Sequence, residues 1–292
     1  MFKHQPERLF TRAILRPPSA SFVAGLTTAG LGVPDYDLAL LQYAKYSKAL
    51  ELCGLSLTHL EGDERFPDST FVEDTAVLVR ARQKPVREQG LALPDLTGKA
   101  LADARASAVS CILTRPGAPS RMGEVEAIKE TVSRFCSRID SINEPGTLDG
   151  GDICEAGNHF FIGISERTNE SGAGQLTELL TTYGYSASCI DIRGVPNILH
   201  LKSGLAYLGE NRLVVIDALR NRKEFQDYDI VPVNAGEEYA ANCVLVNDHI
   251  LIAAGYPVFE QTLRNLGYQT IALQMTEFQK MDGGLSCLSL RF

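Results

Sequence analysis

Residues 152–163 read Asp152-Ile153-Cys154-Glu155-Ala156-Gly157-Asn158-His159-Phe160-Phe161-Ile162-Gly163, which is two short, largely apolar strands on either side of a Gly-Asn tip. Gly and Asn tolerate the positive φ angles of tight turns, so this stretch predicts a β-hairpin. Three further segments have the same shape, at residues 205–216, at 243–252 and, with an interruption, at 75–79 and 110–114. The hairpin is therefore an internal repeat.

Stretches with helical spacing follow these hairpins. Within residues 124–135 apolar side chains recur at Val125, Ile128 and Val132, and residues 173–183 and 259–266 follow the same pattern. A strand often comes next, as at residues 188–192 and 270–273. The repeating unit is thus ββαβ, with a period of roughly 40–50 residues that is typical of propellers and solenoids.

The two ends of the chain complete this repeat. Residues 287–292 form a strand that no hairpin partner follows, and residues 12–16 offer one. Pairing them closes five units into a ring without open edges. We therefore predict an α/β fold, a five-bladed α/β propeller of ββαβ repeats whose ring is closed by pairing of the N- and C-terminal strands. A generic open α/β sheet is the alternative.

The domain organisation follows from the repeat. A chain of 292 residues suits one large domain or two small ones. Because the repeat runs through the chain, we expect a single α/β-propeller domain over residues 1–292. Residues 80–109 interrupt the first repeat with a basic stretch and then an Ala-rich one. We interpret them as an inserted surface excursion of the first hairpin.

Composition excludes several classes of protein. The formal net charge of -8 argues against broad nucleic-acid binding. The chain has seven cysteines, an odd number, and no C-x-x-C pair. We therefore expect reduced thiols in a cytoplasmic protein, rather than disulfides or a structural zinc site. The N-terminus shows no apolar signal region, and no apolar run approaches the roughly 20 residues of a membrane span. We expect no metal and no contact with nucleic acid or membrane.

Polar residues gather just before or at the first strand of each repeat. Equivalent positions of a ring face one axis, so these side chains are expected to converge at one mouth. They are Asp68, Glu73, Asp74, Asp149, Asp152, His200, Lys202, Asn242 and Cys287.

Two of these residues have the chemistry of a nucleophile and a proton carrier. Cys287 follows the pair Gly283-Gly284, which permits close approach of the backbone. A cysteine attacks as thiolate and needs a positive neighbour, such as a bound guanidinium or protonated His200. His200 can act as an acid and then as a base. The alternative reading of each is a buried structural residue, and only their convergence favours catalysis.

The acidic residues suit a cationic ligand. Carboxylates in the otherwise apolar segment 65–75 need a cationic partner if they are buried, because burial of an unpaired charge is costly. A planar guanidinium can bind two of them at once. The alternative role for these residues is N-capping and turn formation, as for Asp149 and Asp152 in their Gly-rich turn. Metal binding is not favoured, because the carboxylates and histidines do not have the spacing of a known metal site. Arg121 and Arg167 are either clamps for a substrate carboxylate or ordinary surface arginines.

Taken together, these motifs resemble the dimethylarginine dimethylaminohydrolases, a family of the pentein (guanidine-modifying) superfamily. The resemblance runs almost end to end, and the family fold is a five-bladed α/β propeller. The segments that carry it are residues 66–74, 114–121, 148–152, 167–169, 199–202, 240–243 and 282–287, with Gly25-Leu26-Thr27 near the start. Residues 80–109 depart from the family, in which a short turn is usual.

The resemblance implies a role for each matching residue. Cys287 is the expected nucleophile, His200 the general acid and base, and Asp149 the acidic residue that supports the histidine. The remaining expected contacts with substrate are the guanidinium-binding carboxylates Glu73 and Asp74, the further contact Asp68, the carboxylate clamp Arg121 and Arg167, the loop residue Leu26 and the backbone of Met281.

The resemblance also implies a reaction. The expected activity is that of a dimethylargininase of arginine metabolism: N-omega-methylated arginine, as asymmetric dimethylarginine or monomethylarginine, is hydrolysed to citrulline and (di)methylamine through a covalent S-alkylthiouronium on Cys287, without a cofactor. The expected partner is a guanidinium amino acid, and a homodimer is a further expectation. The alternatives are an arginine deiminase, an arginine-to-ornithine hydrolase, or a catalytically inactive ligand-binding protein on the same scaffold.

Overall fold

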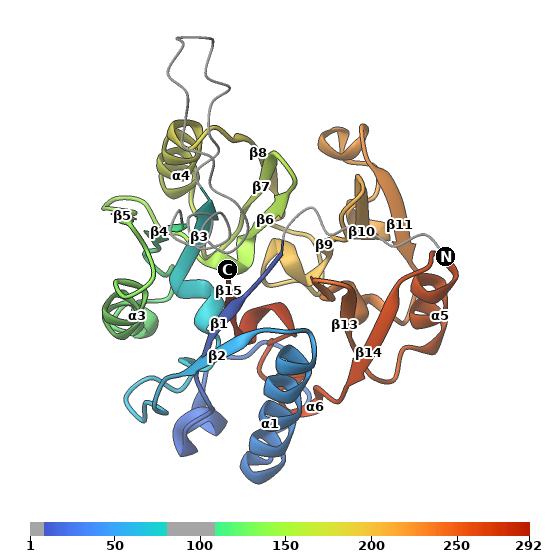
Figure 1. The fold of residues 1–292 in the computed structure, drawn as a ribbon, viewed down its shortest axis with the longest axis horizontal. Coiled ribbons are helices and arrows are strands. Elements are labelled where there is room, and N and C mark those ends of the chain that lie inside the picture. Colours follow the sequence, from blue (N-terminus) through green and yellow to red (C-terminus); the bar gives the residue numbers. More distant parts are fainter. Residues whose placement is uncertain (1–8, 81–108) are drawn as a thin grey trace, which may run out of the picture.

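The computed structural model describes residues 9–80 and 109–292, whose strands form five three-stranded sheets (Figure 1). Helices are few, and the class is α/β as predicted. The order of hydrogen-bonded strands within each sheet is β15-β1-β2, β3-β4-β5, β6-β7-β8, β11-β10-β9 and β12-β13-β14. None of the described helices combines the length and apolarity that crossing a bilayer requires.

Four sheets are built from a hairpin and a parallel third strand. In the second repeat β6 (Ile153–Ala156) pairs antiparallel with β7 (His159–Ile164), which pairs parallel with β8 (Ser186–Asp191). The others follow the same order: β3 (Ala76–Arg80), β4 (Val109–Leu113) and β5 (Arg138–Ser141); β9 (Leu205–Tyr207), β10 (Arg212–Ile216) and β11 (Asp229–Val233); β12 (Val244–Val246), β13 (His249–Ala253) and β14 (Gln269–Leu273). The predicted hairpins are confirmed.

Apart from the short α6 (Thr276–Gln279), the described helices lie in the crossovers to the third strands. The predicted ones are α3 (Glu124–Val132), α4 (Glu170–Thr182) and α5 (Pro257–Asn265). Two helices were not predicted, α1 (Tyr36–Leu52), which crosses from β1 to β2, and α6, which lies between β14 and β15. In the third repeat two single turns, η6 (Asp217–Leu219) and η7 (Lys223–Phe225), replace the helix.

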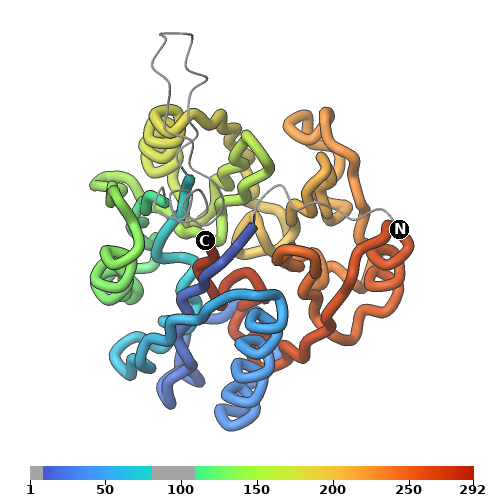
Figure 2. The backbone as a smooth tube through the Cα atoms, viewed as in Figure 1, coloured from blue at the N-terminus to red at the C-terminus, as the bar shows by residue number. Residues whose placement is uncertain are grey.

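The chain ends meet in the remaining sheet. There β1 (Arg12–Leu15) pairs antiparallel with β15 (Leu290–Arg291) and parallel with β2 (Ser56–His59), and Figure 2 shows the N-terminal part of the tube running beside the C-terminal end. The predicted pairing of the ends is confirmed. However, the described strands form five separate sheets and not one closed sheet.

The last strand is shorter than predicted. Cys287 lies in a 3-10 turn, η9 (Ser286–Leu288), and not in a strand. The reason is that the backbone N–H of Cys287 donates to the carbonyl of Gly284, and that of Ser286 donates to the side chain of Asn242. These donors are therefore not available to a sheet.

The interruption of the first hairpin lies between paired residues. Arg80 at the end of β3 pairs with Val109 at the start of β4, so the interruption connects two neighbouring strands. Residues 81–108 themselves lie outside the described residues.

The core is divided among the repeats. Phe161 of β7 packs edge-on against Phe225 of η7, linking the second repeat to the third. The rings of Phe22, Phe71 and Phe278 contact one another and join the segments that follow β1 and precede β3 to helix α6. One member of this aromatic cluster, Phe71, directly precedes the turn that carries Glu73 and Asp74.

The sheet that joins the chain ends should contribute strongly to stability. Ile14 is fully buried on the central strand β1 and is the register partner of Leu290. Ile14→Ala is expected to lower the free energy of unfolding by about 2–5 kcal/mol, because it leaves a cavity. The exposed Val33→Ala should change it by less than about 0.5 kcal/mol. Urea unfolding measures the free energy of unfolding of both variants. Equal losses in the two would contradict a strong contribution of this sheet to stability.

Candidate active site

Short 3-10 turns carry most of the polar residues that were expected to converge. Each turn precedes a first strand of a repeat: η2 (Val72–Thr75), η4 (Gly150–Asp152), η5 (Leu201–Ser203), η8 (Glu238–Ala241) and η9. The turn η2 packs against η4 and η9, and η5 packs against η4 and η8. The convergence therefore arises because the starts of the repeats contact one another.

A small cavity of about 20 Å³ lies at this junction. The predicted residues that line it are Leu26, Asp68, Asp74, Arg121, Arg167, His200, Met281 and Cys287. Sequence reasoning missed the other lining residues, Phe71, Leu199, Asp282 and Gly283, although each is adjacent to a predicted residue or lies in a quoted motif. Asp149 stands directly behind His200, and Glu73 lies elsewhere.

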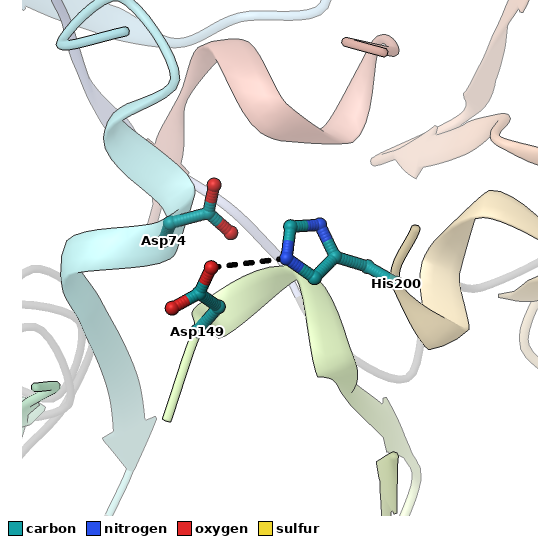
Figure 3. A group of neighbouring side chains, drawn as sticks. All are labelled: Asp74, Asp149 and His200. Atoms are coloured by element: carbon teal, nitrogen blue, oxygen red, sulfur yellow. Dashed lines mark hydrogen bonds and ion pairs between the residues drawn. The ribbon is translucent and has the colours of Figure 1, made fainter. Parts of the chain in front are cut away.

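Two carboxylates face the imidazole of His200, as Figure 3 shows for Asp74 and Asp149. Nε2 of His200 lies 3.0 Å from Oδ2 of the fully buried Asp149. Burial opposes protonation of His200, but the charges of Asp74, Asp152 and Asp149 outweigh it and raise its pKa to about 9. At neutral pH the site therefore contains an imidazolium, ready to donate a proton.

Glycines allow this close packing. A Cβ atom on Gly151 would lie 2.7 Å from Nδ1 of His200, and one on Gly150 would collide with the carbonyl of Glu73. The backbone N–H of Gly151 donates to Oδ1 of Asp74 at 2.8 Å. The Gly-rich turn therefore has a second role besides forming a turn, because its small residues let His200 and the carboxylates lie close together.

Cys287 is buried beside negative charge. Its Sγ accepts a hydrogen bond from the N–H of Gly284 at 3.4 Å. Burial, together with Glu73 and Asp74, raises the pKa of the Cys287 thiol to about 12, against the opposing effects of Gly284 and Lys202. Without a further cation the residue is a thiol at neutral pH.

Asp68 is held at the edge of the cavity by a loop. The N–H of Leu26 donates to both of its carboxylate oxygens, at 3.0 and 3.2 Å. Burial raises the pKa of Asp68, against the lowering effects of Arg121, Leu26 and Arg167. The same loop is tied down further along, since Thr28 donates to Asp282. Leu26 itself is half exposed at the cavity.

The two arginines are placed differently. Arg121 is buried and directs its guanidinium at Asp74 and Glu124, with distances of 2.6 and 2.7 Å, and at two backbone carbonyls. Its donors are therefore committed to the protein. The Arg121 guanidinium and protonated His200 help to hold the pKa of Asp74 at about 2 despite burial. Arg167 lines the cavity, and its guanidinium has no bonding partner within residues 9–80 and 109–292.

Glu73 is not brought to the small cavity. Its carboxylate binds Lys202 at 2.6 Å, Ser286 at 2.7 Å and Arg291 at 3.3 Å. These side chains line a larger cavity of about 730 Å³, which shares no lining residue with the small one. The larger cavity is lined by neither His200 nor Cys287, so the predicted proton carrier and nucleophile both belong to the smaller one.

A metal ion has one candidate site in the described part of the chain. Ligand atoms of Asp74, Asp149 and His200 lie within 4.8 Å of one another. However, Asp149 is bonded to His200, and Asp74 is bonded to Arg121 and Gly151. A metal would have to displace these contacts, so the donor set is better suited to the imidazolium of His200 than to a metal ion.

Comparison with known proteins was made by sequence and by structure. No family model matches the sequence. The N(G),N(G)-dimethylarginine dimethylaminohydrolase of Pseudomonas aeruginosa is 42% identical over 285 residues, which is 97% of this chain and 100% of that protein. The Streptomyces coelicolor protein of the same name is 31% identical over 283 residues, 96% of each chain.

Solved structures agree with this result. The N-terminal domain of the arginine dihydrolase ArgZ is similar, with a TM-score of 0.77 over 96% of this chain and 97% of that one, but its 17% identity indicates a common fold alone. A cysteine-to-serine mutant of the Pseudomonas aeruginosa enzyme, complexed with citrulline, has a TM-score of 0.84 and 41% identity, over 98% of this chain and 100% of that one.

The fold and the sequence similarity place the chain in the pentein superfamily. Within it, the chain belongs to the dimethylarginine dimethylaminohydrolase family.

The effect of the Asp149 charge on the pKa of His200 can be tested by substitution. Asp149→Asn keeps the size of the side chain and removes its charge, so the pKa of His200 should fall from about 9 by roughly one unit or more. The measurement is an NMR titration of the His200 ring protons. An unchanged titration curve would contradict the pairing.

The same pair should shape the pH dependence of stability. The folded pKa of His200, about 9, exceeds the ordinary value of about 6.5. The stabilisation from protonated His200 is therefore complete below about pH 6.5 and is lost as the pH rises through about 9. Urea unfolding should show a smaller loss over this range in Asp149→Asn than in wild type.

Proposed function

We propose that this protein hydrolyses N-omega-methylated arginine, as asymmetric dimethylarginine or monomethylarginine, to citrulline and (di)methylamine. The observation that carries the proposal is a cavity with Asp68 and Asp74, an imidazolium and a buried cysteine, in a chain 42% identical to a dimethylarginine dimethylaminohydrolase. A planar cation is the ligand that such carboxylates favour.

The substrate is held at both ends. We assign the guanidinium to Asp68 and Asp74, and the amino-acid carboxylate to Arg167, whose guanidinium faces the cavity. Arg121 positions Asp74 and reaches a substrate only by giving up its contacts with protein carboxylates. Met281 contributes its backbone, and a guanidinium contact of Glu73 stays a prediction.

Access requires the loop of residues 25–28 to move. A cavity of about 20 Å³ holds little more than one water molecule, so a methylarginine does not fit into it as it stands. The loop is tied to Asp68 through Leu26 and to Asp282 through Thr28. Release of these few hydrogen bonds opens the cavity, and their return excludes water during the reaction.

Catalysis begins when the substrate charge activates the thiol. Binding of the guanidinium cation lowers the pKa of Cys287, the thiol proton passes to water, and the thiolate attacks the central carbon. His200 gives its proton to the departing amine, which leaves a covalent S-alkylthiouronium. Neutral His200 then takes a proton from water, which attacks the same carbon. The C–S bond breaks, the hydroxyl proton of the adduct passes to the departing sulfur, and citrulline is formed with Cys287 again a thiol.

Incubation with candidate substrates tests this activity. Purified protein is given asymmetric dimethylarginine, monomethylarginine or arginine separately, and citrulline and ornithine are measured. We expect citrulline from the methylated substrates, reduced at least about 1,000-fold in Cys287→Ser because the nucleophile is lost. Product from arginine alone would move the protein to the deiminase or arginine-to-ornithine alternative. No product from any of them would favour the inactive scaffold.

The ionisation of Cys287 gives an independent test. Because its pKa in the free protein is raised to about 12, the difference in thiolate absorbance at 240 nm between wild type and Cys287→Ser should stay flat between pH 6 and 9. A thiolate signal already complete near pH 7 would contradict activation by the substrate. Circular dichroism of both proteins controls for a change in fold.

We also propose that the five sheets are the blades of a propeller within a single domain. The support is the common strand order of the repeats, the contacts between their starting turns and the pairing of the chain ends. The surface excursion at residues 80–109, the cytoplasmic location and the homodimer stay predictions.

A further inference from the structure

The fourth repeat differs from the others at the junction of turns. The turns before β3, β9 and β15 supply Asp74, His200 and Cys287 at or beside the small cavity, and the turn before β6 supplies Asp149 behind His200. The turn before β12, η8, contributes no residue to the lining of that cavity. The residue that follows it, Asn242, is a buried amide that lines the larger cavity instead.

The amide of Asn242 uses its hydrogen-bonding groups on two other turns. Its Nδ2 donates to the carbonyl of Lys202 at 2.8 Å and to Oγ of Ser286 at 3.1 Å. Its Oδ1 accepts from the backbone N–H of Ser286 at 2.9 Å. One side chain thus joins the backbone two residues after His200 to the backbone directly before Cys287.

The contact leaves little freedom to the cysteine turn. A Cβ atom on Gly284 would collide with Oδ1 of Asn242, so this glycine is required for the amide to pack against the turn. Tyr239, from the same 3-10 turn η8, donates to the carbonyl of Gly283 at 2.7 Å. The Gly283-Gly284 segment, which donates to Sγ of Cys287, is therefore held from the fourth repeat at two points.

We propose that Asn242 is a positioning residue of the reaction: it fixes the cysteine turn relative to the histidine turn and so sets the placement of the Cys287 sulfur against the His200 imidazole. It acts through the two backbones and does not touch the substrate. The proposal rests on the hydrolysis proposed above, because in that reaction the thiolate attacks the carbon from which the amine protonated by His200 departs. A displacement near 1 Å at such a site costs about 100-fold in rate.

A second asparagine provides the matched control. Asn247 also makes three hydrogen bonds to distant backbone groups, the N–H and carbonyl of Phe10 and the carbonyl of Cys53. It lies in the turn between β12 and β13, two strands of the same repeat, and lines neither cavity. Asn247→Ala therefore removes a similar set of bonds without loosening the cysteine turn.

The experiment compares Asn242→Ala, Asn247→Ala and wild type in steady-state hydrolysis of asymmetric dimethylarginine, with Tm measured for each. We expect both variants to lose stability, but only Asn242→Ala to lose kcat, by about 10- to 100-fold with KM within about threefold. If Asn242→Ala does not fold, Asn242→Asp keeps the acceptor for Ser286 and should still lose kcat. An equal loss of kcat in both alanine variants, or a rise in KM alone, would overturn the proposal.

A second readout separates this proposal from the proposed function. The rate of alkylation of Cys287 by iodoacetamide, followed by intact mass with Cys287→Ser as the blank, needs no substrate. We expect Asn242→Ala to change this rate at least about fivefold and Asn247→Ala to leave it within about twofold. If wild type hydrolyses none of the substrates, the proposed function fails on its own. An unchanged alkylation rate in Asn242→Ala would overturn the positioning role whatever the substrate.

Discussion

The structure depends on a buried cation, the imidazolium of His200, held between carboxylates. Two unpaired carboxylates would be costly in the interior, and a lone imidazolium would lose its proton there. Asp149 and Asp74 remove that cost by facing the ring, and Arg121 balances the remaining charge on Asp74. The network is therefore stable only as a whole, and it requires the starts of three repeats to meet.

The 3-10 turns explain how one junction serves two cavities. Adjacent residues of a tight turn point in different directions, so Asp74 and Cys287 face the small cavity while their neighbours Glu73 and Ser286 face the large one. His200 and Lys202 are divided in the same way. The ion pair of Glu73 with Lys202 and the bond of Ser286 to Glu73 belong to the lining of the larger cavity.

Much of the fold could be predicted from sequence, because hairpins and helices leave local signals such as Gly157-Asn158 and the spacing of Val125, Ile128 and Val132. The convergence of Cys287 and His200 could be predicted because repeats place equivalent residues alike. The direction of Glu73 could not, since it depends on Lys202 and Arg291 from distant turns. Nor could the commitment of Arg121 to Glu124 and Asp74, or the departure of Cys287 from its expected strand, which follows from contacts with Gly284 and, at Ser286, with Asn242.

The ionisation states make sense only when the substrate is included. With the pKa of Cys287 near 12 and that of His200 near 9, the free site holds a thiol and an imidazolium. This is a poor state for attack but the correct one for protonating a leaving amine. The same carboxylates that disfavour the thiolate attract a guanidinium, whose charge then favours it. In the proposed mechanism the nucleophile is therefore formed only when a cation occupies the cavity, which spares the cysteine from other reactions and couples specificity to activation.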